Sequence, residues 1–196
     1  MLWPIKTMSL EAIAAAHGAQ VVYKPFQLFR VFEATGTALP KDRHPSRKRY
    51  RLRDLARTAR FEGLPINLQP AFWPTNPAPA SAAIITAQGI GGGDLAGLVH
   101  GFLKAVWAED RDIADAAVVR DILGAHGFDP ALADRGLLAA METLARNTDE
   151  ALARGVFGAP TYAIGEELFW GQDRLPQLER HLTELGGAPQ EHEAGA

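Results

Sequence analysis

The segment Gly155-Val156-Phe157-Gly158-Ala159-Pro160-Thr161-Tyr162 decides the fold, because it leads into two short β-forming runs separated by a glycine turn. These runs, residues 161–164 and 166–170, flank Gly165 and predict an antiparallel hairpin. A proline at the first residue of a strand cannot donate a ladder hydrogen bond, and this position tolerates it. A helix over residues 173–185 is predicted to follow and to cover one face of the hairpin.

Pro160 can open its strand in two ways. A cis bond between Ala159 and Pro160 would turn the backbone of Ala159 outward, where it can pair with an extended peptide ligand. An ordinary trans proline is the alternative, and statistics alone favour it, because only about 5–6% of X–Pro bonds in folded proteins are cis. The residues around Pro160 do not decide between the cis and the trans bond.

Working upstream, almost every residue from 80 to 155 follows a helical pattern. Helices are predicted over residues 82–90, 94–107, 115–126 and 129–154. Asp94 caps the second helix, and Asp129-Pro130 opens the fourth with an N-cap residue followed by proline. Four short helices need a common core, which their leucine, valine, alanine and phenylalanine side chains can supply. We therefore expect one helical subdomain.

The first part of the chain mixes helical, extended and loop patterns. A helix over residues 8–17 should end at Gly18, and a short strand should follow over residues 21–26. Residues 30–47 resemble a loop, because glycine and two prolines punctuate a polar stretch. A helix should run from Ser46, as its N-cap, to Gly63, and a proline-rich extended connection should follow over residues 64–76.

The composition excludes several classes of protein. With no cysteine among 196 residues, the chain has no disulfide, no CxxC redox centre and no thiolate nucleophile, so it is not a disulfide oxidoreductase. The N-terminal residues lack the apolar core of a signal peptide, and charges interrupt the longest apolar run, 113–123. We expect a cytoplasmic protein that does not enter a membrane.

One segment is strongly basic although the whole chain carries a formal charge of −3. Residues 41–60 hold nine Lys or Arg and two Asp, which gives +9 − 2 = +7 and leaves −10 for the rest. A solvated helix face accounts for most of these charges, and no nucleic-acid partner is predicted, because no aromatic platform is interleaved with them. The histidines lie apart in different elements, so no metal site is predicted either.

Taken together, Gly155–Thr161, the hairpin and Phe169-Trp170-Gly171-Gln172-Asp173-Arg174-Leu175 resemble the C-terminal part of DsbA-like thioredoxin folds. Within these, the chain resembles the kappa-class glutathione transferases and the 2-hydroxychromene-2-carboxylate isomerases. Further stretches resemble the isomerase family in the same order, namely residues 24–26, 31–36, 49–57, 63–65 and 105–113. The likeness covers nearly all of residues 10–185.

The resemblance implies an α/β fold, thioredoxin-like of the DsbA/kappa type, with an inserted all-helical subdomain. The thioredoxin-like domain would comprise residues 1–78 and 155–185, the helical insertion residues 79–154, and a flexible tail residues 186–196. It further implies a glutathione-dependent isomerase whose substrate is a small aromatic acid such as 2-hydroxychromene-2-carboxylate. A kappa-class-like transferase and a non-catalytic thioredoxin-fold binding protein are the alternatives. Relatives often form homodimers, so a homodimer is possible.

The resemblance also assigns the ligand site. Ala159 and Pro160 would form a cis-proline step facing glutathione, and Gln172 and Asp173 would hold its γ-glutamyl end. A carboxylate suits the tripeptide's ammonium group, but Asp173 is equally explained as a plain helix N-cap. Arg174 would bind an anion or lie in solvent.

Other implied contacts lie earlier in the chain. Arg47 matches a ligand-contacting lysine of the family, and it keeps the charge while adding a fork suited to carboxylates. Tyr50, one turn later, would share that pocket or simply pack. Trp73 and Asn76 would border the aromatic substrate, although core packing is the better interpretation of Trp73.

The chain departs from the family at its beginning. The family starts with a strand and then has Ser-Pro-aromatic at the first helix, where the serine stabilises the glutathione thiolate. Counting back from His17-Gly18 places that serine at Met1 or before it, so no catalytic residue is assigned. Leu2-Trp3-Pro4 would be a remnant of this motif. The first strand is therefore expected to be missing, and we expect an N-terminally truncated sequence; the alternative is a diverged member with little catalysis.

Overall fold

The computed structural model describes residues 7–187. In this range the chain forms eight α-helices, three short 3-10 helices and two β-strands. In chain order they are α1 Thr7–Ala16, α2 Leu28–Thr35, η1 Pro40–Asp42, α3 Pro45–Glu62, α4 Ala78–Ile90, α5 Leu95–Trp107, α6 Ala116–Ala125, η2 Pro130–Ala133, α7 Leu137–Ala153, β1 Thr161–Ile164, β2 Glu167–Trp170, η3 Gln172–Arg174 and α8 Leu175–Gly187.

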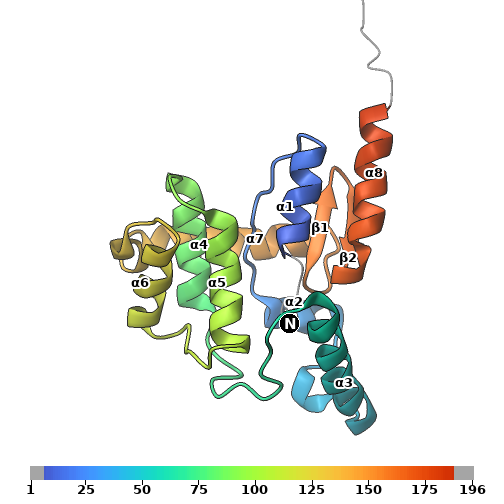
Figure 1. Cartoon of the computed structure of the whole chain (residues 1–196), viewed down its shortest axis with the longest axis horizontal. Coiled ribbons are helices and arrows are strands. Elements are labelled where there is room, and N and C mark those ends of the chain that lie inside the picture. The colour runs from blue at the N-terminus through green and yellow to red at the C-terminus, as the bar shows by residue number, and fades with distance from the viewer. Residues whose placement is uncertain (1–6, 188–196) are drawn as a thin grey trace, which may run out of the picture.

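The predicted helical core is present. Helices α4, α5 and α6 stand side by side at one end of the molecule, and α7 extends from α4 toward the hairpin (Figure 1). Leu98 and Leu123 are fully buried between these helices, and Phe102, Trp107 and Val119 are nearly so. This is the largest apolar cluster among residues 7–187, so the main hydrophobic stabilisation comes from the helices.

Local capping residues set many helix ends as predicted. The Asp94 side chain accepts a hydrogen bond from the Gly97 N–H at 2.8 Å, at the start of α5. Asp115 does the same for Ala117 at 2.7 Å, at the start of α6. Gly63 ends α3 in the left-handed conformation, with φ of 67°, where a side chain would be strained.

Three predicted helix boundaries are wrong, and one of them is the start of α4, which lies at Ala78 and not at residue 82. The predicted helix over 129–154 is divided, because Asp129 caps only the short η2, and Gly136, with φ of 70°, separates it from α7. Helix α3 begins with His44 as N-cap and Pro45 as its first residue, and the His44 ring accepts from the Ser46 N–H at 3.3 Å. Ser46 is thus already helical, because Pro45 supplies a helical φ one residue earlier.

The predicted hairpin is confirmed. Strands β1 and β2 pair antiparallel, with Thr161 opposite Trp170 and Ile164 opposite Glu167. Helix α8 contacts β2 and α1, so α1, the hairpin and α8 form the other end of the molecule (Figure 1). The fold is mostly helical with a small antiparallel sheet, and the two strands are the whole sheet within residues 7–187.

The predicted strand over 21–26 is wrong. These residues are neither helix nor strand, and no strand lies alongside them in the described range. Instead, the Tyr23 N–H donates to Gln88 Oε1 at 2.7 Å, and Tyr23 O accepts from Gln88 Nε2 at 2.9 Å. A side-chain amide of α4 thus takes the place of a neighbouring strand.

The predicted loop over 30–47 is wrong in its first part. Helix α2 occupies Leu28–Thr35 and buries Val31 and Phe32, and Gly36 ends it in the left-handed conformation. The stabilisation gained by burying Val31 and Phe32 is larger than the preference of the following residues for a turn. Three expectations, the serine position at Met1, the Leu2-Trp3-Pro4 remnant and most of the tail, lie outside residues 7–187. Within that range, no helix combines the length and apolarity needed to span a bilayer.

Candidate functional site

A pocket of about 370 Å³ lies at the open end of the hairpin. It is lined by the two residues before β1, by the last residue of β2 and the four residues after it, and by one leucine of α3. These residues are Leu55, Ala159, Pro160, Trp170, Gly171, Gln172, Asp173 and Arg174. Four of the sequence-predicted ligand residues, Ala159, Pro160, Gln172 and Asp173, thus meet in one place. We call this the hairpin pocket.

The backbone of the hairpin pocket is held by hydrogen bonds on both sides of Pro160. The Ala159–Pro160 bond is cis, as the family resemblance implies. Pro160 O accepts from the Gly171 N–H at 3.0 Å, which continues the β1–β2 ladder by one bond. The Thr161 hydroxyl donates to Gly158 O at 2.8 Å. These hydrogen bonds hold the residues before β1 next to the residue that follows β2.

Trp170 forms one wall of the hairpin pocket. Its indole lies directly over Gly158 and contacts Phe157, with ring centroids 4.7 Å apart. Only a residue without a side chain fits at position 158, because a Cβ there would lie 3.0 Å from indole Cε2 and closer still to Nε1. Sequence reasoning missed both residues. The hairpin register was the available signal, since it places Trp170 opposite Thr161, three residues after Gly158.

The polar side of the hairpin pocket carries both signs of charge. Asp173 Oδ2 lies 3.3 Å from Arg174 Nη1, and both side chains are largely exposed. Asp173 therefore pairs with its neighbour inside η3. The N-cap interpretation would require Asp173 to be the residue immediately before α8, but Arg174 occupies that position. An exposed ion pair of this kind contributes little to stability, which leaves both groups available to a ligand.

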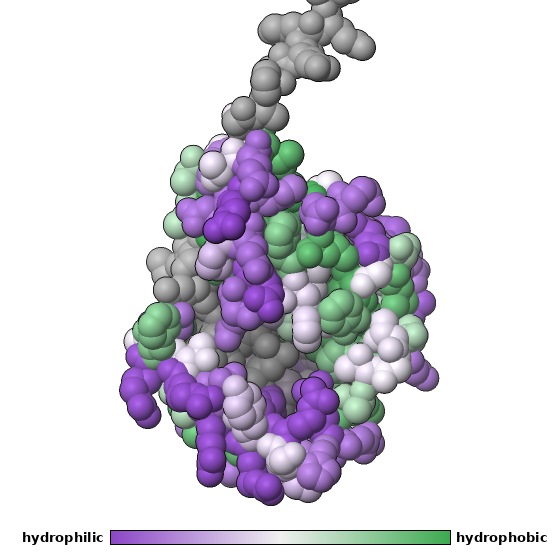
Figure 2. Space-filling model, turned by 90° about the vertical axis from the view of Figure 1, so that its right-hand side faces the viewer, coloured by the Kyte–Doolittle hydropathy of each residue, from purple (hydrophilic) through white to green (hydrophobic). Residues whose placement is uncertain are grey.

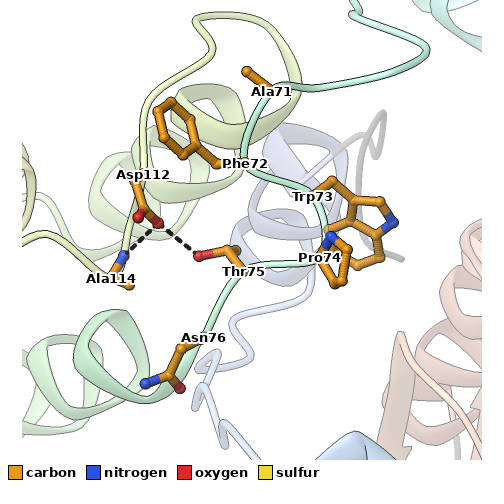
Figure 3. A pocket seen from close by; sticks show the side chains of 8 residues that line it. All are labelled: Ala71, Phe72, Trp73, Pro74, Thr75, Asn76, Asp112 and Ala114. Carbon is orange, nitrogen blue, oxygen red and sulfur yellow. Dashed lines mark hydrogen bonds between the residues drawn. The ribbon is translucent and has the colours of Figure 1, made fainter.

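Trp73 and Asn76 line a different pocket, of about 330 Å³, in the connection before α4 (Figure 3). Asp112 organises it, because its Oδ1 accepts from the Thr75 hydroxyl at 2.7 Å and from the Ala114 N–H at 3.0 Å. Trp73 points away from Phe72 and packs on Trp107, with centroids 4.7 Å apart, but it is 37% exposed and lines the pocket, so it is not a core side chain. This pocket shares no lining residue with the hairpin pocket.

Arg47 and Tyr50 lie on α3, outside the linings of both pockets. Tyr50 is 62% exposed, and the Arg57 guanidinium sits 5.4 Å from its ring centroid. Hydrophilic side chains cover the lower end of the face in Figure 2, where α3 lies. The structure therefore brings the hairpin residues together and leaves the predicted α3 residues on the surface beside them.

Comparison with known proteins identifies the class. The family model described as "DSBA-like thioredoxin domain" matches residues 5–183. The chain belongs to the family of DSBA-like thioredoxin-domain proteins, and the curated relatives described below are named as isomerases.

The particular relatives share one name. A 2-hydroxychromene-2-carboxylate isomerase of Pseudomonas putida is 31% identical over 182 residues, which cover 90% of this chain and 86% of that protein. An isomerase of the same name from Pseudomonas sp. (strain C18) is 47% identical over 51 residues, 26% of this chain and 23% of that protein. A solved structure of 2-hydroxychromene-2-carboxylate isomerase superposes with a TM-score of 0.71 at 29% identity, covering 91% of this chain and 87% of that one.

Proposed function

We propose that this protein is a glutathione-dependent isomerase of an aromatic carboxylate such as 2-hydroxychromene-2-carboxylate. The names of its relatives support the reaction, and one structural observation carries the ligand assignment. That observation is the meeting of the Ala159–Pro160 step with Gln172, Asp173 and Arg174 in a single pocket. Backbone groups, an amide and two opposite charges suit a peptide ligand that carries an ammonium group and carboxylates.

The residues of the hairpin pocket fit glutathione in size and charge. A volume of about 370 Å³ falls within the range of ~300–1,000 Å³ common for small-molecule pockets. Asp173 would bind the ammonium group, Arg174 would bind a carboxylate, and Gln172 would donate and accept hydrogen bonds between them. When bound, glutathione supplies the thiolate nucleophile of the proposed reaction. Leu55 and the Trp170 indole would shield one side of the ligand from water.

Calorimetric titration with reduced glutathione tests this assignment. We expect the folded chain to bind, and the Asp173→Ala variant to lose binding, because it removes the carboxylate that would pair with the ammonium group. Glu184→Ala is the matched control, since Glu184 is an exposed carboxylate of α8 outside the pocket. A folded protein that gives no heat and no thermal shift, or an Asp173→Ala variant that binds as well as the parent, would contradict the glutathione site.

A second prediction concerns the charge on α3. Leu55 brings this helix to the edge of the hairpin pocket, while Arg47, Arg49 and Arg53 are exposed with no ion-pair partner among the described residues. We expect kcat/KM for an anionic aromatic substrate to fall roughly 2–5-fold between 0.01 M and 0.15 M salt, because the Debye length shrinks from about 30 Å to about 8 Å. Initial rates at several ionic strengths measure this.

The matched control is the double variant Arg49→Gln and Arg53→Gln. It should flatten the salt dependence and leave kcat unchanged, since neither residue lines the pocket. A salt dependence as steep in the double variant as in the parent would show that Arg49 and Arg53 do not attract the substrate.

A further inference from the structure

The pocket in the connection before α4 differs from the hairpin pocket in the sign of its charge, and we call it the connection pocket. Asp112 is the one charged residue in its lining, which contains no lysine, arginine or histidine among the described residues. A second carboxylate supports the wall, because Asp110 Oδ1 accepts from the N–H of the lining residue Ala71 at 2.9 Å. The connection pocket is therefore acidic.

These two carboxylates have no cationic partner. The neighbouring Arg111 is directed to other acids, since its Nη2 lies 2.5 Å from Asp121 Oδ2 and its Nη1 lies 3.8 Å from Glu109 Oε2. Within residues 7–187, neither Asp110 nor Asp112 takes part in an ion pair. The negative charge at the connection pocket is thus not neutralised by the part of the chain that the structure describes.

Hydrogen bonding in the lining leaves a charged acceptor unused. The Thr75 hydroxyl and the Ala114 N–H both donate to Asp112 Oδ1, so the second oxygen, Oδ2, has no hydrogen-bond partner in the described range. The Asn76 amide accepts from the Ala78 N–H at 3.1 Å through Oδ1, and its NH₂ group remains as a neutral donor. A charged acceptor with only a neutral side-chain donor beside it favours a cationic ligand over an anionic one.

An aromatic ring lies on the same side of the connection as the carboxylate. Figure 3 shows the Phe72 ring and Asp112 on one side and the Trp73 indole on the other. Phe72 is 43% exposed, so its ring is open to a ligand. Such a ring packs against hydrocarbon and attracts a cation placed over its face. The volume of about 330 Å³ is near the lower end of the ~300–1,000 Å³ range, which indicates a small ligand.

We propose that the connection pocket binds a small organic amine. The ammonium group pairs with Asp112 Oδ2, and the apolar part of the amine lies against Phe72. A metal ion fits less well, because a hard cation such as Ca²⁺ takes about six to eight oxygen ligands, and the described residues contain no group of three or more potential metal ligands. An aromatic acid would place its carboxylate beside that of Asp112, where like charges repel.

This assignment goes beyond the proposed isomerase function and differs from the role that the family resemblance implies for Trp73 and Asn76. Two probes with the same ring and opposite charge distinguish them: at pH 7 benzylamine is a cation and benzoate is an anion. In an NMR titration, we expect benzylamine to shift the backbone amide signals of Phe72, Thr75 and Asp112, and benzoate to leave them in place. Shifts caused by benzoate, alone or as large as those of benzylamine, or no shifts with either probe, would overturn the proposal.

The variant Asp112→Asn tests the charge alone, because it keeps an oxygen that can accept from Thr75 and Ala114. We expect it to weaken benzylamine binding at least ~10-fold, since a hydrogen bond to a charged group is lost. Asp42→Asn is the matched control, because Asp42 is an exposed carboxylate of η1 outside the lining, and it should bind benzylamine as the parent does. Equal affinities of Asp112→Asn and the parent would contradict the proposed ion pair.

A second variant tests the ring without touching the hydrogen bonds of Asp112. Because Phe72 is largely accessible, Phe72→Leu should stay folded and weaken benzylamine binding about 2–5-fold. Unchanged binding would show that the amine does not lie against Phe72. Glutathione binding is measured at Asp173, and the two pockets share no lining residue, so failure of the amine site leaves the glutathione assignment standing and the reverse also holds.

Discussion

Replacing Leu123 by alanine is expected to lower the free energy of unfolding by about 3 kcal/mol. Leu123 is fully buried in the helical core, and its helix α6 contacts α4, α5 and η2. Its removal loses the transfer free energy of the side chain and leaves a cavity that closely packed helices cannot fill. For a protein of this length, the loss corresponds to a fall in Tm of roughly 6–12 °C.

Urea denaturation followed by circular dichroism measures this change, with an unchanged slope showing that the variant still unfolds in the same way. Leu138→Ala is the matched control, because Leu138 is 77% exposed at the start of α7. Its free energy of unfolding should change by less than about 0.5 kcal/mol. If both variants lost equal stability, the apolar cluster around α4–α6 would not be the main core.

Local signals account for the parts of the fold that the sequence predicts well. Asp94 and Asp115 cap their helices through residues two or three positions ahead, so the cap is visible in any short window. Gly63 ends α3 because only glycine adopts its positive φ without strain. The hairpin is similarly local, since the loop between its strands is two residues long.

Long-range contacts explain the parts that it misses. Tyr23 belongs to a β-forming run, but its backbone bonds to the Gln88 side chain, 65 residues away. The sequence around Tyr23 gives no indication that Gln88 is its partner. Helix α2 is a different case, because Leu28, Val31 and Phe32 have helical spacing and Gly36 ends the helix, so a local signal was present and was missed; packing against α7 then buries Val31 and Phe32.

In the candidate site too, the part that depends on local sequence is predicted and the part that depends on long-range packing is not. Ala159 and Pro160 lie near Gln172 and Asp173 because the hairpin returns the chain to its starting point, which the sequence predicts. Whether Arg47 faces the same pocket depends on the rotation of α3 about its axis, and that rotation is set by packing. To predict that the Trp170 indole lies over Gly158, one must know the register of the two strands. The alternation of apolar and polar residues does not define a unique register in strands of four residues.

Substituting Gly158 by alanine is expected to open the hairpin pocket and to weaken glutathione binding by about tenfold or more, corresponding to at least ~1.4 kcal/mol. The new Cβ would overlap the Trp170 indole, which is 52% exposed and can move outward. The pocket would lose its aromatic wall while the helical core stays intact. Titration calorimetry measures the affinity, and the tryptophan fluorescence spectrum reports the movement of the indole.

Two further variants separate this effect from a general loss of folding. Gly89→Ala is the matched glycine control, because no atom lies within 4 Å of the position its Cβ would take and its φ is not positive; it should bind glutathione normally and be as stable as the parent or slightly more so. Adding Trp170→Ala to Gly158→Ala removes the overlap, so any stability that the overlap costs should be regained, while glutathione binding stays weak because the aromatic wall itself is gone. Normal binding by Gly158→Ala would show that Trp170 does not shape the ligand site. Recovery of binding in the double variant would show instead that the indole only obstructs the pocket.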